Sequence, residues 1–312
     1  MKCYLCGSEK SHKREGKVRD NPSINILECD ECGLVFLDTQ NTGDEFYQNN
    51  EMLDESFFKF CKRDESSEKI SAERLLALKE TFLKDQEVWW KRRFEFCKES
   101  LIGKTLLDFG SGYAGFLRFA KDLAKSVVGV ELEEQVKPIY EKYNIPLVRS
   151  LEEAKNLIIN GGGGELFDII TAFHVIEHLQ DPISILKELN SLLKDNGKII
   201  IEVPNANDAL LTIYENKAFR EFTYWSPHLY LYNTHTLRKL GEKAGFKVEF
   251  VKGIQRYPLS NTLYWLSKGK PAGQKIWGKF LDNEILQQSY EQSLASLGAT
   301  DTLIAQFVKS KS

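Results

Sequence analysis

Two Cys-x-x-Cys pairs near the start of the chain have the residue type and spacing of a metal site. Cys3 and Cys6 form the first pair, Cys29 and Cys32 form the second, and a glycine follows each pair at once. Four thiolates in this arrangement suit tetrahedral zinc and leave no open position at which the ion could activate water. Disulfide bonds are the alternative, but the cytoplasm, where we expect this chain, disfavours them. The spacing therefore predicts a structural zinc ion.

A second candidate site is the glycine-rich stretch 106–115, Leu-Leu-Asp-Phe-Gly-Ser-Gly-Tyr-Ala-Gly. An apolar run ends in Asp108, and Gly110 and Gly112 then precede a second apolar stretch. This order predicts a buried strand, a tight turn that a ligand can approach closely, and a helix. Since the spacing Gly-x-Gly-x-x-Gly also fits a dinucleotide, the motif alone leaves the cofactor undecided.

Histidines mark a third candidate site, in the segment His174-Val-Ile-Glu-His178-Leu. The segment matches an inverted zinc-protease motif, in which two imidazoles lie a helical turn apart. That motif needs a long helix and a further acidic ligand, whereas here a predicted strand precedes the segment and a Gln-Asp-Pro turn follows it. Tyr264-x-x-x-Lys268 matches a pattern of short-chain nicotinamide dehydrogenases, but it comes after the sixth predicted strand and looks accidental.

The elements that would position these residues alternate between apolar β-rich segments and helical ones, which predicts a parallel sheet covered on both faces. The second predicted strand ends in Glu131, 19 residues after Gly112. A carboxylate there can accept hydrogen bonds from both hydroxyls of a ribose, and a solvated strand-end acid is the alternative. The predicted strands cover 105–109, 126–131, 146–149, 167–173, 197–203 and 246–251, and a last strand covers 302–309.

Taken together, these motifs resemble the class I S-adenosylmethionine-dependent methyltransferases. The matching segments are Asp108-Phe-Gly-Ser-Gly112, Glu131, Phe167-Asp168, Phe173-His-Val-Ile-Glu-His-Leu, the fifth-strand region 193–204, the segment 228–246 and a last strand at 301–308. The resemblance implies a Rossmann-like α/β fold with a seven-stranded, mostly parallel sheet. A small zinc-ribbon module would precede this fold, and a helical insertion would interrupt it before the last strand.

The resemblance also implies where S-adenosylmethionine binds. Gly110 and Gly112, with Asp108 behind them, would line its methionine end, and Glu131 would hold its ribose. Arg149 stands where the family often has an acid that marks the adenine pocket, so the adenine contacts stay open. The implied cofactor-binding residues are Asp108, Gly110, Ser111, Gly112, Glu131, Phe173 and His174.

Methyl transfer is an in-line displacement from a sulfonium, so the protein mainly positions the two reactants and removes the acceptor's proton. His178 and His228 lie on loops that this family's fold places over the methyl group. Because an imidazole titrates near neutrality, both are our candidate bases. A helix-cap histidine and a packed loop histidine are the alternatives, and His174 is expected to be structural or cofactor-adjacent.

A four-cysteine module ahead of such a domain resembles methyltransferases of sugar and surface-polysaccharide pathways. Their C-methyltransferases usually carry a large extra C-terminal domain and a Glu-His pair, where this chain has Pro227-His228. We therefore expect O-methylation of a carbohydrate-type acceptor, either a nucleotide sugar or a surface glycan. The alternatives are another small-molecule or lipid hydroxyl, sugar C-methylation, or a zinc-ribbon factor that binds nucleic acid or protein.

The segment before the glycine-rich stretch is expected to be helical, because residues 68–100 are rich in helix formers with apolar spacing of three and four. Arg92 and Arg93 could reach a cofactor carboxylate or remain solvated, and Tyr47 suits either a lid or the core. The residues expected to pack this helix onto the main domain are Trp89, Trp90, Phe94 and Phe96.

Composition sets the remaining limits. The 312 residues carry a net charge of -3, which gives no general attraction to nucleic acid. No apolar stretch approaches the roughly 20 residues needed to cross a bilayer, and no signal-peptide core is present. We expect a cytoplasmic monomer or homodimer, with peripheral membrane contact possible.

The segment 252–279 has six basic residues, no acid and several aromatic rings. It predicts either a cover for a phosphate-bearing sugar or a helical hairpin packed by its tryptophans. The expected domains are a zinc-binding module at 1–38, a helical connector or lid at 39–103, a cofactor-binding domain at 104–252 with 301–312, and a helical insertion at 253–300.

Overall fold

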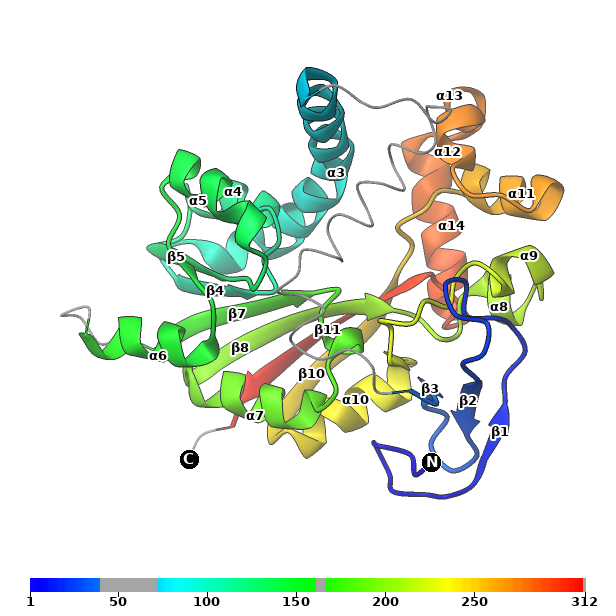
Figure 1. Cartoon of the computed structure of the whole chain (residues 1–312), viewed down its shortest axis with the longest axis horizontal. Coiled ribbons are helices and arrows are strands. Elements are labelled where there is room, and N and C mark those ends of the chain that lie inside the picture. Colours follow the sequence, from blue (N-terminus) through cyan, green and yellow to red (C-terminus); the bar gives the residue numbers. More distant parts are fainter. Residues whose placement is uncertain (40–71, 161–165, 311–312) are drawn as a thin grey trace. The chain divides into compact units, whose positions relative to one another are not determined.

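The computed structural model describes residues 1–39, 72–160 and 166–310 (Figure 1). The strands of its larger sheet are β4 (Thr105–Phe109), β5 (Ser126–Val130), β6 (Leu147–Val148), β7 (Phe167–Phe173), β8 (Leu193–Pro204), β10 (Phe246–Ile254) and β11 (Thr302–Lys309). They are hydrogen-bonded in the order β10-β11-β8-β7-β4-β5-β6. β4 to β7 run parallel, whereas β11 is antiparallel to both β10 and β8. The predicted Rossmann-like sheet is therefore confirmed.

The helices follow the strands in the predicted alternation. The longer ones are α3 (Ala72–Leu101), α5 (Lys137–Tyr143), α6 (Leu151–Asn160), α7 (Pro182–Ser191), α10 (Thr234–Lys243), α11 (Leu259–Lys268) and α14 (Glu284–Ser296). The short ones are α4 (Gly115–Ala120), α8 (Ala209–Thr212), α9 (Lys217–Arg220), α12 (Gly273–Ile276), α13 (Gly278–Leu281) and the 3-10 turns η1 (Glu134–Val136) and η2 (Ile176–His178).

The apolar runs that predicted strands are buried in the sheet. Leu107 in β4 and Ile170 in β7 are both fully shielded from solvent. β8 begins at Leu193 instead of 197, because its first residues are a polar Lys-Asp-Asn-Gly stretch that hides the strand in the sequence. β10 continues to Ile254, where it still pairs with Thr302 of β11.

Two compact units divide the chain. One comprises residues 43–172 and 191–197, and the other comprises residues 1–42, 173–190 and 198–312. In the first unit, β4, β5, β6 and most of β7 carry the glycine-rich turn, and α3 packs on α4. The packing is tight, since a Cβ at Gly115 would come 1.9 Å from the Trp90 ring. Phe94 stacks on Phe119 at 5.7 Å, as expected for the aromatic face of this helix.

In the second unit, the N-terminal residues form a small antiparallel sheet of β1 (Ser11–Lys13), β2 (Ile26–Cys29), β3 (Val35–Leu37) and β9 (Tyr230–Leu231). β9 comes from far along the chain and pairs with β3. The buried core of this sheet combines Val18, Ile26, Val35 and Leu37 with Ala206, Leu211, Tyr224 and Leu231. The N-terminal residues thus share a core with the segment that carries His228, which the cysteine spacing did not indicate.

Helices α11 to α14 fill the chain between β10 and β11, as the predicted insertion requires. Three aromatic residues of this insertion, Tyr264, Trp265 and Trp277, are packed against other rings. Trp265 is 2% exposed and lies edge-on to Phe219 at 5.1 Å, and Tyr264 lies edge-on to Trp277 at 5.0 Å. These contacts favour the packed-hairpin interpretation of the tryptophans. Among the helices that the structure describes, none combines the length and the hydropathy needed to cross a membrane.

Candidate functional site

The turn between β4 and α4 is shaped by its glycines and held by β5. Gly110 and Gly112 have φ angles of 70° and 51°, in the left-handed region that favours glycine. Gly110 and Ser111 both donate their N–H groups to the Val130 carbonyl, at 2.9 and 3.1 Å. The buried Tyr140 hydroxyl donates to Ser111 Oγ at 2.6 Å. Tyr140, which sequence reasoning did not single out, therefore fixes the side chain at the centre of the turn.

Glu131 lies against the same turn. Its carboxylate accepts backbone N–H groups from Gly112 at 2.7 Å, Leu132 at 2.8 Å and Glu133 at 3.1 Å. Burial raises its pKa, and the three N–H donors oppose that shift because they stabilise the ionised form. The structure thus gathers four of the predicted cofactor-binding residues, Gly110, Ser111, Gly112 and Glu131, at the carboxyl ends of β4 and β5.

Arg149, which stands where an adenine-pocket acid was expected, supports the segment after Glu131. Its Nη1 donates to the carbonyl oxygens of Glu131 and Glu133 at 2.8 and 2.9 Å. Its Nη2 donates to the Glu134 carboxylate at 3.0 Å. The guanidinium thereby closes the turn that positions the Glu131 carboxylate.

Asp108 is buried at the end of β4, where its Oδ1 accepts a hydrogen bond from Thr171 Oγ1 at 2.6 Å. Burial raises the pKa of Asp108 to about 7, and the Thr171 hydroxyl and the Arg93 cation reduce that shift. Sequence reasoning left Arg93 between a cofactor contact and a solvated residue. In the structure its charge acts on Asp108.

The raised pKa of Asp108 predicts a pH-dependent stability. Between pH 4 and 7 the folded chain keeps a proton on Asp108 that the unfolded chain releases, so the free energy of unfolding falls as pH rises through 7. Asp108→Asn should remove up to about 4 kcal/mol of this dependence, at about 1.4 kcal/mol per pKa unit. Urea unfolding of both chains from pH 4 to 8 measures it. An equal change in Asp122→Asn, at an exposed turn, would refute the assignment.

His174 follows β7 directly and takes part in a buried ionic network within its unit. Its backbone is left-handed, with φ of 57°. Arg256 Nη1 donates to His174 Nε2 at 2.6 Å, so the ring carries its hydrogen on Nδ1 and donates it to Glu177 Oε1 at 3.1 Å. Glu202 Oε1 lies 3.1 Å from the same Nε2. The His174 ring therefore lies between the fully buried carboxylates of Glu177 and Glu202, and in this tautomer it donates only to Glu177.

Arg256 was missed by the sequence analysis, which counted it among the basic residues of a possible phosphate-binding cover. Its side chain instead contacts His174, 82 residues earlier. Its backbone N–H and that of Tyr257 donate to the Asp301 carboxylate, at 3.0 and 2.9 Å. Glu202 and Asp301 were also missed, since only their positions at strand ends distinguished them. Glu177 stood inside the His-x-x-Glu-His motif, which was its signal.

The two candidate bases lie side by side. The ring centroids of His178 and His228 are 4.7 Å apart, and Trp225 lies edge-on to both. His178 ends the 3-10 turn η2 instead of lying on a loop, and it is 4% exposed, whereas His228 is half-buried. Burial lowers the pKa of His178 and lowers that of His228 well below its usual range. Both imidazoles are therefore neutral at pH 7, the form that accepts a proton.

The geometry around His174 and His178 excludes the zinc-protease arrangement. η2 spans only residues 176–178, so His174 and His178 do not lie one turn apart on a long helix. The Glu177 carboxylate lies between them, at 3.1 Å from His174 Nδ1 and 4.0 Å from His178 Nε2. Hydrogen bonding from His174 and the nearby imidazoles outweigh the effect of burial and lower the pKa of Glu177 to about 2.

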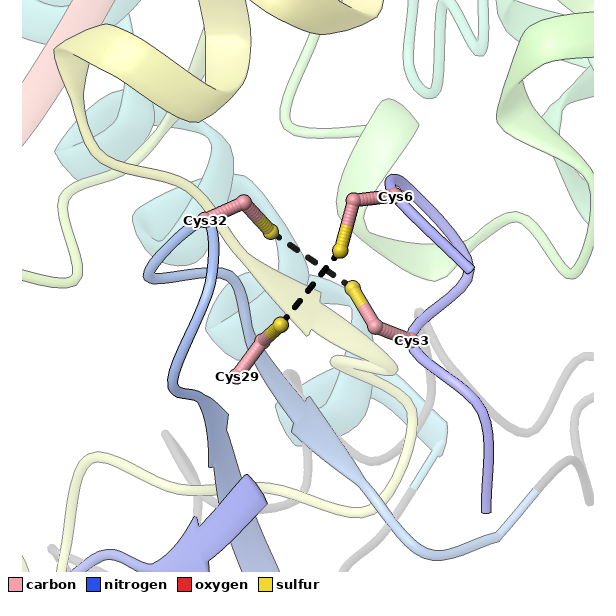
Figure 2. Close-up of side chains that lie close together, drawn as sticks. All are labelled: Cys3, Cys6, Cys29 and Cys32. Atoms are coloured by element: carbon pink, nitrogen blue, oxygen red, sulfur yellow. Dashed lines mark hydrogen bonds between the residues drawn. The ribbon is translucent and has the colours of Figure 1, made fainter. Parts of the chain in front are cut away.

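The four predicted zinc ligands converge in the second unit (Figure 2). All four sulfur atoms lie within 4.8 Å of one another, with Cys3 Sγ 3.6 Å from Cys32 Sγ and Cys6 Sγ 3.4 Å from Cys29 Sγ. These distances approach the edge of about 3.8 Å for a tetrahedron with zinc–sulfur bonds of about 2.3 Å. They exceed the about 2.05 Å of a disulfide, so the disulfide alternative is excluded.

The glycines after the cysteine pairs lie in left-handed backbone turns. Gly7 and Gly33 adopt φ angles of 78° and 72°, and their N–H groups donate to the carbonyls of Cys3 and Cys29 at 2.8 and 2.9 Å. Each pair thus forms a tight turn with its sulfurs directed to a common centre (Figure 2). The donor set of four cysteines fits zinc.

The structure places the remaining predicted site residues as follows. Phe173 is the last residue of β7 and is buried, and with His174, His178 and His228 it belongs to the second unit. Asp108 to Gly112 and Glu131 belong to the first unit. Tyr47, a candidate lid residue, lies outside the described residues.

Comparisons with known proteins agree with this fold. A family model described as a methyltransferase domain matches residues 68–250. The ubiquinone biosynthesis O-methyltransferase of Aeromonas salmonicida (strain A449) is 25% identical over 175 residues, which cover 52% of this chain and 70% of that protein. The enzyme of the same name from Coxiella burnetii (strain Dugway 5J108-111) is 28% identical over 170 residues, covering 52% and 71%.

Among solved structures, a SAM-dependent methyltransferase from Archaeoglobus fulgidus is similar, with 20% identity and a TM-score of 0.47. The likeness covers 73% of this chain and 99% of that one.

Proposed function

The chain belongs to the methyltransferase-domain family and is an S-adenosylmethionine-dependent methyltransferase, and we propose that it transfers the methyl group to an oxygen of a small-molecule or glycan acceptor. The observation that carries the oxygen acceptor is the pair of neutral imidazoles at His178 and His228. A hydroxyl must lose its proton as it attacks, and a neutral imidazole can take it.

For the cofactor, we propose that the turn at Gly110 to Gly112 receives the methionine end and that Glu131 binds the ribose. The support is geometric: the Glu131 carboxylate is oriented by three backbone N–H donors and lies against the turn. Carboxylates at this strand end bind ribose hydroxyls in nucleoside-binding sheets of this type. Phe173 and His174 are proposed to lie near the methyl sulfonium.

Two classes of acceptor are proposed, a carbohydrate-type hydroxyl and a ring hydroxyl of another small molecule. Curated relatives are named for O-methylation in ubiquinone biosynthesis, which supports an oxygen acceptor and makes a ring hydroxyl of a small molecule the second candidate. The carbohydrate-type acceptor stays a prediction, with its basis in the four-cysteine module. No similar protein reported above is named for a sugar.

Isothermal titration of S-adenosylmethionine tests the cofactor site. Glu131→Gln removes the negative charge that would accept the ribose hydroxyls, so affinity should fall by about tenfold to 100-fold, the loss of about 1.5–3 kcal/mol for hydrogen bonds to a charged group. Glu141→Gln is the matched control, because its side chain is 66% exposed and its carboxylate lies 4.0 Å from Lys137 Nζ, away from the turn. Equal affinities for the two variants would refute the role of Glu131.

Labelled S-adenosylmethionine tests the acceptor. Nucleotide sugars, oligosaccharides and phenols should be incubated with the cofactor-loaded enzyme, and label should appear on oxygen in one of these classes. Product labelled on carbon or nitrogen would refute the proposed O-methylation.

A further inference from the structure

A second metal site is built around the carboxylate of Glu177. We propose that Glu177, His178 and His228 bind one divalent cation, separate from the ion of the four cysteines. The ligand atoms of these three side chains all lie within 4.8 Å of one another. Two imidazoles and one carboxylate are a ligand set that first-row divalent metals use when other positions stay open to substrate.

The two oxygens of the buried Glu177 carboxylate differ in their hydrogen bonding. The Glu177 side chain is fully buried, its Oε1 accepts the hydrogen bond from His174, and its Oε2 has no hydrogen-bond partner among the residues that the structure describes. A buried carboxylate oxygen without a partner is costly, and such an atom calls for a structural explanation. A cation bound by this carboxylate, beside the two imidazoles, would supply the positive partner that the buried charge requires.

The imidazoles have the orientation of metal ligands. The Pro227 carbonyl can only accept, so His178 Nδ1, 3.1 Å away, carries the hydrogen and donates it. The lone pair of His178 is then on Nε2, the nitrogen that lies on the side of Glu177, 4.0 Å from Oε1. A backbone carbonyl that fixes one ring nitrogen while the other binds the ion is the common second shell of metal-binding histidines.

The surrounding hydrogen bonds hold the Glu177 carboxylate in place, and the half-buried His228 leaves one side of the cluster open to solvent. His174 is clamped between Glu177 and Arg256, so the Glu177 Oε1 position is fixed. His228 is half-buried, so the cluster has one side that an ion and an acceptor oxygen can reach. With nitrogen and oxygen donors and no thiolate, the site suits Mn²⁺, Fe²⁺, Co²⁺ or Zn²⁺.

The role of the ion, unlike its binding, rests on the proposed function. An acceptor hydroxyl bound to the ion would have a lowered pKa and would release its proton to water. The resulting oxygen would form the O–CH₃ bond as the S–CH₃ bond breaks, and S-adenosylhomocysteine would leave. His178 and His228 would then act as ligands, and the ion would do the work assigned above to a free imidazole.

Cobalt is the probe for this site. The chain is first loaded with one equivalent of zinc to fill the cysteine cluster and is then titrated with Co²⁺. We expect one further equivalent to bind, with visible d–d absorption and without the thiolate charge-transfer band that a cysteine site would add. Glu177→Gln and His228→Ala should each lower the Co²⁺ affinity at least about 10-fold, the lower end of what removal of a metal-site partner costs.

His235→Ala is the control, because His235 is exposed on α10 and should leave Co²⁺ binding unchanged. Binding of S-adenosylmethionine by each variant reports that it has folded. Absence of Co²⁺ binding to the zinc-loaded chain, or equal binding by wild type, Glu177→Gln and His228→Ala, would overturn the proposal. A chain that binds Co²⁺ but methylates no oxygen would contradict the proposed function and leave the metal site standing.

Discussion

Replacing Cys32 with serine is expected to release one equivalent of zinc and to unfold the small N-terminal sheet. Cys32 is 5% exposed and its sulfur lies 3.6 Å from that of Cys3, so serine at this position would leave the cluster with three thiolates. In small zinc modules the binding free energy is also folding free energy, about 10–16 kcal/mol. Metal content after dialysis and the thermal unfolding midpoint measure the two effects.

The damage should extend beyond the metal. β3 pairs with β9 just after His228, Asp20 accepts the Ser226 N–H at 3.0 Å, and Arg19 lies over the Trp225 ring at 4.9 Å. Loss of the N-terminal sheet therefore removes supports of the histidine pair, and turnover should fall with the metal content. Cys97→Ser is the control, because Cys97 is a buried thiol on α3 outside the cluster. If Cys32→Ser kept its full zinc content and unfolding midpoint, the four-cysteine site would be wrong.

His228→Ala and His178→Ala are expected to lower kcat by about 100-fold to 10,000-fold, the range for loss of a general base. The reason is the same whether the imidazole takes the proton or holds the ion that acidifies the hydroxyl. Neither histidine is among the residues proposed to bind S-adenosylmethionine, so the affinity for the cofactor should not change. Steady-state kinetics and isothermal titration separate the two quantities.

The pH profile distinguishes the two roles of the histidines. As a free base, an imidazole whose pKa is lowered by burial is already neutral at pH 7, so kcat should be flat there and fall only in more acidic solution. As ligands, the histidines should make kcat depend on added divalent metal at a fixed pH. His235→Ala should keep the wild-type rate. Full turnover in both His178→Ala and His228→Ala would refute their place in the reaction.

The sequence by itself determined the elements that depend on local pattern. Apolar runs bounded by turn residues predicted β4 and β7 to the residue, and the Cys-x-x-Cys spacing predicted the four-sulfur cluster. Glycines marked both left-handed turns, at 110 and 112 and after the cysteine pairs. These features are predictable because side-chain periodicity, backbone φ preference and ligand spacing act over a few residues at a time.

Only the tertiary structure decided what surrounds the histidines. It brings Pro227 to His178 from 49 residues away and Arg256 to His174 from 82, and it gives the N-terminal sheet its fourth strand from β9. None of these contacts leaves a periodic signal, since each depends on which buried polar group finds a partner once the apolar faces have packed. Glu177 Oε2 also depends on the tertiary structure, because burial of the carboxylate leaves this oxygen without a hydrogen-bond donor among the described residues.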